Sequence, residues 1–257
     1  KYLVIEADEY NKSFHHYFPQ IAVVTNIDAE HLDTYKNLKG VVAGFARYFK
    51  NVKKGGTLVL NGKDKELRVL GARFLKSKKI NVVFYNQGRA KKFPLLIPGT
   101  HNQENAEGAA TAARFLGIGD KAIEKVCKSY QGAWRRMELL SQNLKVKSQI
   151  YSDYAHHPTE IKATLAALRG KFPRKRIVCV FEPHQSDRLI RLFDAFKTAF
   201  KDADKVVLLP TYKVSGREEI VSDQKKDSFA LAQEVGRRKR QTFYAQTFGD
   251  AIKLVKF

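Results

Sequence analysis

The 257-residue chain has very little cysteine, only Cys127 and Cys179, which lie in separate apolar segments without metal-ligand spacing. This scarcity argues against a disulfide-stapled domain and a cysteine-rich zinc site. The chain also lacks an apolar run long enough to cross a bilayer, and no signal-peptide pattern opens it. We therefore expect a cytoplasmic protein with two buried, reduced thiols and no membrane partner.

Acidic residues are few relative to basic ones. The chain has 47 Lys and Arg against 26 Asp and Glu, which gives a net charge of +21. Such a surface attracts polyanions, but no zinc finger, RNP-like aromatic pattern or basic leucine-zipper heptad accompanies it. The composition favours an enzyme with anionic substrates and predicts no nucleic-acid partner. A non-catalytic, basic protein that binds nucleotides or nucleic acid stays open as the alternative.

Both ends of the sequence are abrupt. Residues 1–5 already have the pattern of a buried strand and include no initiator methionine, and residues 251–257 read as a helix that simply stops. Natural domains seldom begin inside a core strand, because their termini usually lie outside the core. We therefore expect the chain to be a fragment of a longer protein, while its length allows two α/β domains.

Apolar β-branched runs alternate with helical spacing, which indicates a mostly parallel sheet covered by helices. In the first part we expect strands at 1–5, 21–26, 57–61 and 81–84, and helices at 38–49 and 105–116. In the second part we expect a hairpin around Asn143 (137–140 with 146–151), strands at 176–181, 206–209 and 241–244, and helices after Pro158, from Asp187, within 228–235 and at 251–257. A boundary near 134–136 gives two domains, 1–134 and 135–257.

Two polar clusters in the first domain follow predicted strands. Glu6 begins an acidic run at 6–9 whose carboxylates could hold a divalent cation, although an acidic helix N-terminus is the better explanation of this run taken alone. The second cluster, 25–33, places Asn26, His31 and three carboxylates within one turn after an apolar strand. Such density is uncommon in a purely structural turn, and it favours a functional site.

A third cluster, 98–106, precedes an alanine-rich helix. Gly99 permits a tight turn, and Asn102 and Asn105 carry amides that could hydrogen-bond the edge of a heterocycle. A capped amphipathic helix accounts for the rest of this segment.

In the second domain, His184 and Arg188 follow a strand and could face a carboxylate or a phosphate. Arg135 and Arg136 add cationic groups at the domain boundary.

The segment 151–161 is the most informative of the polar clusters. It places Asp153, Tyr154, His156 and His157 where a strand turns into a helix that begins near Pro158. Open α/β sheets bind ligands at the carboxyl ends of their strands, so this junction is a candidate site. The alternative is a well-capped junction whose histidines are merely solvated.

Together these segments resemble the Mur ligase family, the ATP-dependent amide-bond ligases of peptidoglycan assembly, and most closely its alanine-adding members. The resemblance runs along nearly the whole chain, and its motifs follow in the family's order. They are 6–9 (Glu-Ala-Asp-Glu), 25–27 with 31–35, 99–106 (Gly-x-His-Asn-x-x-Asn-Ala), Gly132 with 135–136, 153–160, and Phe181 with 183–184.

The resemblance implies a partial central ATPase domain followed by a Rossmann-like C-terminal domain. It also implies roles for individual residues. By this resemblance the magnesium ligands would be Glu6 and His31, and the catalytic groups would be His31, His184 and Arg188. The nucleotide would contact Asn102, Asn105, Arg136, Asp153 and Tyr154. The other substrates would contact Asn26, His157, His184 and Arg188.

The implied reaction joins L-alanine to UDP-N-acetylmuramate through an acyl phosphate, with ATP and Mg²⁺ as cofactors. Because phosphorylation activates the carboxylate, no serine or cysteine nucleophile is required, and we find no motif for one. A related ligase that adds a preformed peptide stays open as an alternative, and the sequence leaves the oligomeric state open.

The chain also departs from the family pattern. It has no Gly-rich phosphate loop, which the resemblance would place before Lys1 together with the UDP-binding domain, and the closing strand expected after Phe257 is missing. We therefore expect no ligase activity from this chain alone. Gln185 stands where alanine-adding members commonly carry an arginine, which leaves the amino-acid preference open.

Overall fold

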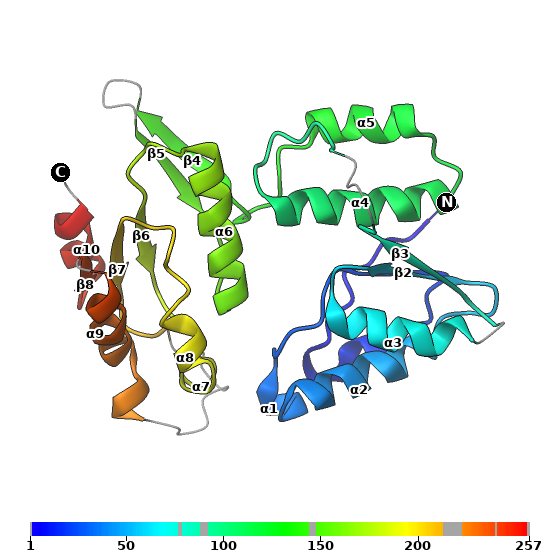
Figure 1. Cartoon of the computed structure of the whole chain (residues 1–257), viewed down its shortest axis with the longest axis horizontal. Coiled ribbons are helices and arrows are strands. Elements are labelled where there is room, and N and C mark those ends of the chain that lie inside the picture. Colours follow the sequence, from blue (N-terminus) through cyan, green and yellow to red (C-terminus); the bar gives the residue numbers. More distant parts are fainter. Residues whose placement is uncertain are drawn as a thin grey trace. The chain divides into compact units, whose positions relative to one another are not determined.

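The computed structural model describes residues 2–76, 79–87, 92–143, 148–212, 223–239 and 241–255 (Figure 1). The chain folds as two compact units, one made of 1–96 with 101–130 and the other of 97–100 with 131–257. The assignment of 1–134 and 135–257 to two functional domains stays a prediction. No helix in the described part of the chain is long and apolar enough to cross a membrane.

The first unit is built on a parallel sheet of three strands in the order β1 (Ile21–Val24), β2 (Thr57–Asn61), β3 (Asn81–Tyr85). The predicted strands at 21–26, 57–61 and 81–84 are therefore confirmed. Every residue of β2 is buried, because this strand lies between the other two and is covered on both faces. This explains its continuous apolar sequence, which lacks the alternation of a half-exposed strand.

Helices cover this sheet on both sides (Figure 1). On one side lie α2 (Leu38–Phe49) and α3 (Lys65–Leu75), whose apolar faces share a core with Leu58 and Leu60. Each helix begins at a side-chain cap: Asn37 accepts a hydrogen bond from the backbone of Gly40, and Asp64 from that of Leu67. On the other side lies α4 (Thr100–Phe115), which packs with α5 (Asp120–Ser129) around a smaller core. The predicted helix at 38–49 is confirmed, and the one at 105–116 begins five residues earlier.

The predicted strand at 1–5 is wrong for the residues described. Residues 2–5 form neither strand nor helix, and their side chains are exposed, Val4 by 90%. A strand requires a hydrogen-bonding neighbour, and β1 pairs with β2 alone. Beyond this segment come a 3-10 helix, η1 (Tyr10–His16), and a single turn of helix, α1 (Leu32–Tyr35).

The second unit contains a second parallel sheet, in the order β6 (Val178–Phe181), β7 (Lys205–Leu208), β8 (Thr242–Tyr244). Alternate residues of β7 divide between two cores. Val206 and Leu208 pack with α6 (Pro158–Lys171), α7 (Ser186–Arg191), α8 (Phe193–Phe196) and α9 (Ser228–Arg238), whereas Val207 packs with α10 (Phe248–Val255). A short 3-10 helix, η2 (Gln224–Lys226), precedes α9. The predicted strands and helices of this part are therefore confirmed within a few residues at each end.

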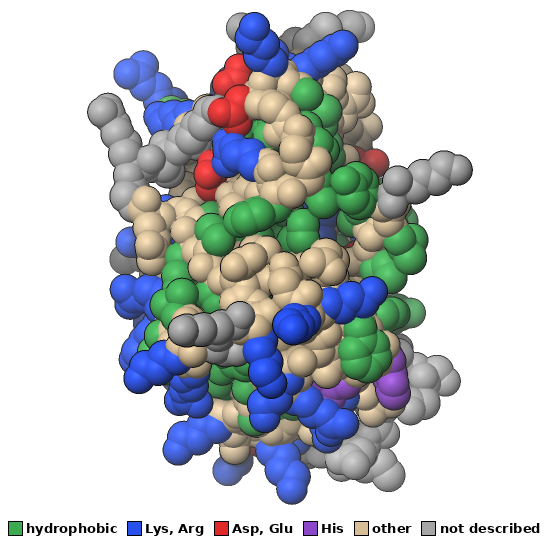
Figure 2. Space-filling model, turned by 90° about the vertical axis from the view of Figure 1, so that its right-hand side faces the viewer, with side chains coloured by type: hydrophobic (Ala, Val, Ile, Leu, Met, Phe, Trp, Pro, Cys, Tyr) green, Lys and Arg blue, Asp and Glu red, His purple; other side chains and the backbone are tan. Residues whose placement is uncertain are grey.

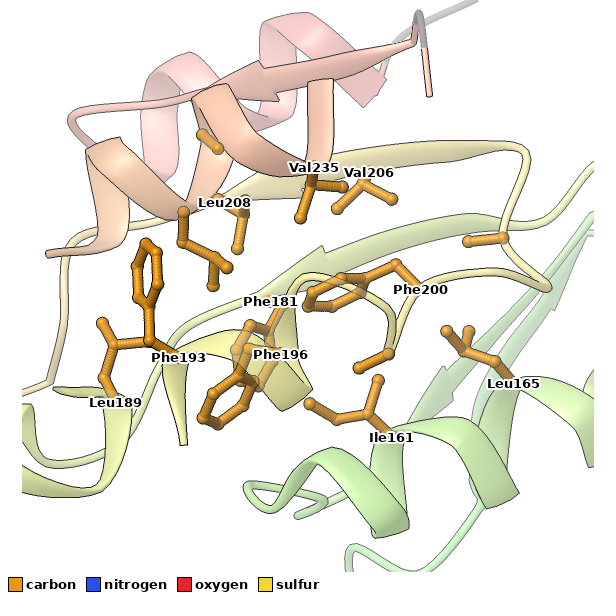
Figure 3. Packing of buried hydrophobic residues seen from close by; sticks show 14 of the residues in the cluster. Ile161, Leu165, Phe181, Leu189, Phe193, Phe196, Phe200, Val206, Leu208 and Val235 are labelled. Carbon is orange, nitrogen blue, oxygen red and sulfur yellow. The ribbon is translucent and has the colours of Figure 1, made fainter. Parts of the chain in front are cut away.

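Aromatic rings fill the larger core of this unit (Figure 3). Phe200 is 2% exposed and lies 5.4 Å from the ring of Phe181, which in turn lies 5.9 Å from Phe196. Cys179 also packs against this core, and burial raises the pKa of its thiol to about 12. Cys127 is buried in the α4–α5 core, as predicted, whereas Cys179 is half-buried.

An antiparallel hairpin of β4 (Glu138–Asn143) and β5 (Ser148–Ser152) precedes α6. The predicted hairpin around Asn143 is thus confirmed, although part of its second strand, 146–147, lies outside the described residues. The C-terminal helix predicted at 251–257 is confirmed up to residue 255, beyond which the chain is not described.

The surface reflects the unequal charge. Figure 2 shows one face of the molecule, on which Lys and Arg side chains spread over the lower part while Asp and Glu gather near the top. Several exposed cations belong to α3 or follow it, among them Lys65, Arg68, Arg73 and Lys76.

Candidate functional site

Polar side chains form a hydrogen-bonded layer where β1, β2 and β3 end. The buried Asn61 amide donates to the carbonyl of Thr25 at 3.0 Å, and its oxygen accepts from the Asn86 amide at 3.2 Å. Asp64 accepts from the backbone of Ile27. These contacts fix the loop that begins at Thr25, so the predicted cluster at 25–33 starts from a rigid base. The side chain of Asn26 is exposed at this edge.

His31 lies at the start of α1 in a left-handed conformation, with φ 51°. Its Nε2 atom is 3.4 Å from a carboxylate oxygen of Glu9, and its ring packs against Tyr10. The hydrogen bond from His31 holds the pKa of Glu9 below its ordinary value, although burial opposes this shift. Tyr35 donates to the carbonyl of Glu9 at 2.7 Å and anchors the acidic run. The carboxylate that accompanies His31 is therefore Glu9, whereas Glu6 is exposed in the preceding segment.

Replacing Glu9 tests this pair. The pKa of Glu9 is lower in the folded protein than in the unfolded chain. The ionised carboxylate therefore stabilises the fold at a pH above the unfolded-state pKa, and this stabilisation is lost as the pH falls through the folded-state pKa. We expect Glu9→Gln to lower the free energy of unfolding at pH 6 by no more than about 1 kcal/mol, since the pair is partly exposed. The difference from the wild type should shrink between pH 5 and pH 3 in urea titrations. Glu6→Gln is the matched control, and an equal effect in both variants would contradict the assignment.

One amide side chain of the segment 98–106 makes hydrogen bonds that hold the fold together. Gly99 has φ 111°, as the predicted tight turn requires. Gln103, which the sequence analysis did not single out, accepts a hydrogen bond from the backbone N–H of Phe93 at 2.7 Å and donates to its carbonyl at 3.0 Å. Asn105 is exposed on the helix and Asn102 is half-buried, so the side chain of Asn105 in particular is accessible to a ligand.

Among the described residues, two oxygens beneath α4 have no hydrogen-bond partner. They are the Tyr85 hydroxyl and Oε2 of Glu107, and both atoms are buried. Gly108 brings the helix against the Tyr85 ring, and a Cβ there would lie 3.0 Å from it. Burial, with Glu104 and Asp64 adding negative charge, raises the pKa of the Tyr85 phenol.

In the second unit, four rings and one guanidinium gather into what we term the ring cluster: Arg135, Tyr154, His156, His184 and Tyr212. The Arg135 guanidinium lies 4.7 Å from the centre of the Tyr154 ring. The rings of Tyr154 and His156 are each 6.0 Å from that of His184, and Tyr212 stacks on His184 at 5.4 Å. The cluster joins two segments that the sequence analysis treated separately, 151–161 and 181–188.

Asp153 ties the start of the hairpin to its end. One carboxylate oxygen accepts from the backbone of Met137 and the other from that of Ala155, both at 2.8 Å. Tyr154 donates its backbone N–H to the carbonyl of Arg135 at 2.7 Å. These bonds hold 135–137 beside 153–155, and a nucleotide contact by Asp153 stays a prediction.

The structural part of this role can be measured through Asp153→Asn. Asparagine keeps one acceptor oxygen, so one of the two backbone N–H groups loses its partner. We expect the free energy of unfolding to fall by about 1–2 kcal/mol without any ligand present. Asp194→Asn, which removes the carboxylate of an exposed surface pair, serves as the control and should leave stability unchanged. Equal stability of Asp153→Asn and wild type in urea would contradict this account.

Glu160 and His157 cap helix α6. Glu160 accepts from the backbone N–H groups of His156 and His157, while the His157 ring accepts from that of Thr159. Burial raises the pKa of Glu160, but His156, these two N–H groups and Arg136 outweigh it and hold the pKa below its ordinary value. His157 is only 5% exposed, so the structure gives it a capping role. Its predicted substrate contact is untested, as is the phosphate contact of Arg136, whose Nη1 is 3.6 Å from Glu160.

The structure brings some predicted site residues together. Tyr154 and His184 share the ring cluster, and Arg188 donates to the carbonyl of His184 at 3.3 Å from one turn along the chain. In the first unit, His31 stands with Glu9 rather than Glu6. Glu9 was not predicted as the partner of His31, although it lies in the acidic run at 6–9 that was singled out from the sequence. Tyr212 was not predicted either, because it lies in no motif and is recognised only from its pairing with His184.

The predicted magnesium ligands can be compared with the structure. Within the described ranges, no three His, Cys, Asp or Glu side chains lie close enough together to hold a metal ion. Mg²⁺ often binds through one or two protein carboxylates, with water and substrate phosphates completing the shell. The carboxylate of Glu9 beside His31 fits that donor set, whereas Glu6 is exposed.

The fold is that of a two-unit α/β protein, with candidate residues after strands of both parallel sheets and after the antiparallel strand β5. The carboxyl end expected at residues 151–161 therefore belongs to a hairpin and not to a parallel sheet. The family profile described as Mur ligase middle domain matches residues 1–91, and that described as Mur ligase, glutamate ligase domain matches residues 135–256. The chain belongs to the Mur ligase family.

Curated relatives point to one branch of that family. The chain is 35% identical over 256 aligned residues to a UDP-N-acetylmuramate–L-alanine ligase of Clostridium acetobutylicum, covering 90% of this chain and 54% of the relative. It is also 35% identical over 235 residues to the enzyme of that name from Pelotomaculum thermopropionicum, covering 82% of this chain and 50% of the relative. The chain thus spans about half the length of the curated relatives it matches.

Solved structures support the fold. The UDP-N-acetylmuramate–alanine ligase MurC of Thermotoga maritima aligns with a TM-score of 0.70 at 18% identity, covering 96% of this chain and 55% of that one. MurF of Acinetobacter baumannii also aligns with a TM-score of 0.70, at 16% identity, covering 95% of this chain and 54% of the MurF chain. Folylpolyglutamate synthase of Mycobacterium tuberculosis, solved with ADP, has a TM-score of 0.69 at 18% identity, covering 94% of this chain and 57% of that one.

Proposed function

We propose that the chain provides part of an ATP-dependent ligase that joins L-alanine to UDP-N-acetylmuramate through an acyl-phosphate intermediate in peptidoglycan precursor synthesis. The observation that carries this proposal is the 35% identity to UDP-N-acetylmuramate–L-alanine ligases across 90% of the chain. The ordered series of six motifs agrees with it.

The second unit would receive the amino acid. His184 and Arg188 carry donors suited to the α-carboxylate of L-alanine, and the half-buried position of both side chains strengthens their interaction with an anion. Holding the amine in place before reaction removes much of the entropic barrier to amide formation. The hydrogen bond from Arg188 to the carbonyl of His184 keeps the two residues in a fixed relation.

The nucleotide contacts are proposed residue by residue, from the family resemblance. We assign Asn102 and Asn105 to the base, Asp153 and Tyr154 to the nucleotide, Arg136 to the phosphates, and Asn26 and His157 to substrate contacts. The ADP complex of folylpolyglutamate synthase, which shares the fold, supports a nucleotide site. Mg²⁺, once bound, would offset the negative charge of the phosphates that the substrate carboxylate must approach. Glu6, Glu9 and His31 are the groups we assign to that ion.

The proposal can be tested with a chimera in which this chain replaces the matching segment of the Clostridium acetobutylicum ligase. We expect the chimera to consume ATP and form UDP-N-acetylmuramoyl-L-alanine when both substrates are present. A chimera that folds, binds ATP and forms no such product would overturn the proposal.

A related ligase that adds a peptide is the second candidate, because Gln185 stands where alanine-adding members commonly carry an arginine. The chimera separates the two candidates when L-alanine is exchanged for a tripeptide. A basic nucleic-acid-binding protein would instead bind arbitrary duplex DNA tightly, with strong salt dependence and no preference for ATP.

A further inference from the structure

Tyr212 lies outside every segment to which the sequence or the family resemblance gives a role. It follows β7, and its backbone forms an isolated parallel bridge with that of His184. The N–H of Tyr212 donates to the carbonyl of Pro183 at 2.7 Å, and its carbonyl accepts from the N–H of Gln185 at 3.1 Å. Residue 184 is thus bracketed on both sides by hydrogen bonds to one residue.

The side chains of the two bridged residues also meet. The rings of Tyr212 and His184 lie 5.4 Å apart with 20° between their planes, which is a stacked arrangement. Directly opposed residues of neighbouring strands place their side chains on the same face, so the bridge itself produces this contact. The tyrosine ring therefore restricts the orientation of the imidazole.

The surroundings of His184 complete this restriction. Its Nδ1 atom is buried, and the rings of Tyr154 and His156 approach from the segment that follows β5. The imidazole is thus enclosed by Tyr212 and by these two rings. Tyr212 is 52% exposed, so its ring covers the imidazole on a side that would otherwise face solvent.

We propose that Tyr212 is a positioning residue for the amino-acid substrate, which it orients through the stacked imidazole of His184. The inference rests on the proposed function, in which the second unit receives L-alanine. It assigns the effect to the aromatic ring rather than to the phenol hydroxyl, because the ring makes the contact with His184.

The test is a set of L-alanine titrations of the intact chain, followed by NMR with ¹⁵N-labelled histidine. We expect Tyr212→Leu to raise the Kd for L-alanine by about three- to tenfold, the range that loss of one aromatic pair produces. Tyr212→Phe, which keeps the ring, should stay within about twofold of the wild type. The ¹⁵N chemical shifts of the His184 ring should change in Tyr212→Leu and should match those of the wild type in Tyr212→Phe.

Tyr244→Leu is the matched control, because it removes a tyrosine of the same unit that packs against Phe229 instead. It should leave both the Kd and the His184 shifts unchanged. The role of Tyr212 is contradicted if Tyr212→Leu binds L-alanine as tightly as the wild type. It is also contradicted if Tyr212→Phe binds L-alanine as weakly as Tyr212→Leu. Either result leaves the proposed function standing. A wild-type chain that binds ATP but no L-alanine would remove the amino-acid role of this unit, and the inference with it.

Discussion

His184→Ala in the chimeric ligase is expected to lower kcat/KM for L-alanine by about a hundredfold, the size of effect that misplacement of a reacting group produces. The variant removes the imidazole at the centre of the ring cluster, which three other rings hold in place. A coupled assay of ADP release at varied L-alanine concentration measures the effect. The KM for ATP should change much less, because no nucleotide contact is assigned to His184.

His16→Ala provides the matched control for this experiment. His16 is an exposed histidine of the 3-10 helix η1 in the first unit, and no role is assigned to it. It should retain wild-type kinetics. If His184→Ala retained them as well while both variants melted normally, the amino-acid site would not be at the ring cluster.

Phe200→Ala is expected to lower the free energy of unfolding of the second unit by about 3–5 kcal/mol. The ring is 2% exposed and contacts Phe181, so truncation leaves a cavity in the core that supports β6 and β7 (Figure 3). Since β6 and β7 lead directly to His184 and Tyr212, this variant should also weaken L-alanine binding. Urea unfolding followed by circular dichroism measures the stability.

Phe248→Ala offers the comparison, because Phe248 belongs to α10 and is 64% exposed. Its loss should change the free energy of unfolding by no more than about 0.5 kcal/mol. A loss in Phe200→Ala below about 1 kcal/mol would mean that the aromatic core does not support this unit as described.

Most of the fold could be predicted from local pattern. The strand at 57–61 and the helix at 38–49 were predicted residue for residue, because a short apolar run and an amphipathic repeat each favour a single structure. The segment 1–5 has an equally good strand pattern, but its structure depends on a neighbouring strand, which a local pattern does not reveal. Prediction failed there because strand formation is a property of pairs.

The candidate site was predictable to the extent that its residues lie in motifs. Tyr154, His184 and Arg188 were named from sequence, and the first two meet in the ring cluster. The pairing of His31 with Glu9 instead of Glu6 depends on how η1 and α1 fold back on each other, which spacing alone does not determine. Tyr212 was beyond reach, because its contact with His184 arises from the bridge after two parallel strands.

An NMR titration of the intact ¹⁵N-labelled chain with L-alanine shows whether the second unit binds the amino acid at the ring cluster and Arg188. We expect saturable binding, with the largest shifts at His184, Arg188 and the rings around His184, which are Tyr154, His156 and Tyr212. D-alanine should compete weakly, because the same groups would hold its carboxylate while its amine points elsewhere. Saturable shifts confined to other residues, or no saturable binding by a folded chain, would contradict the account.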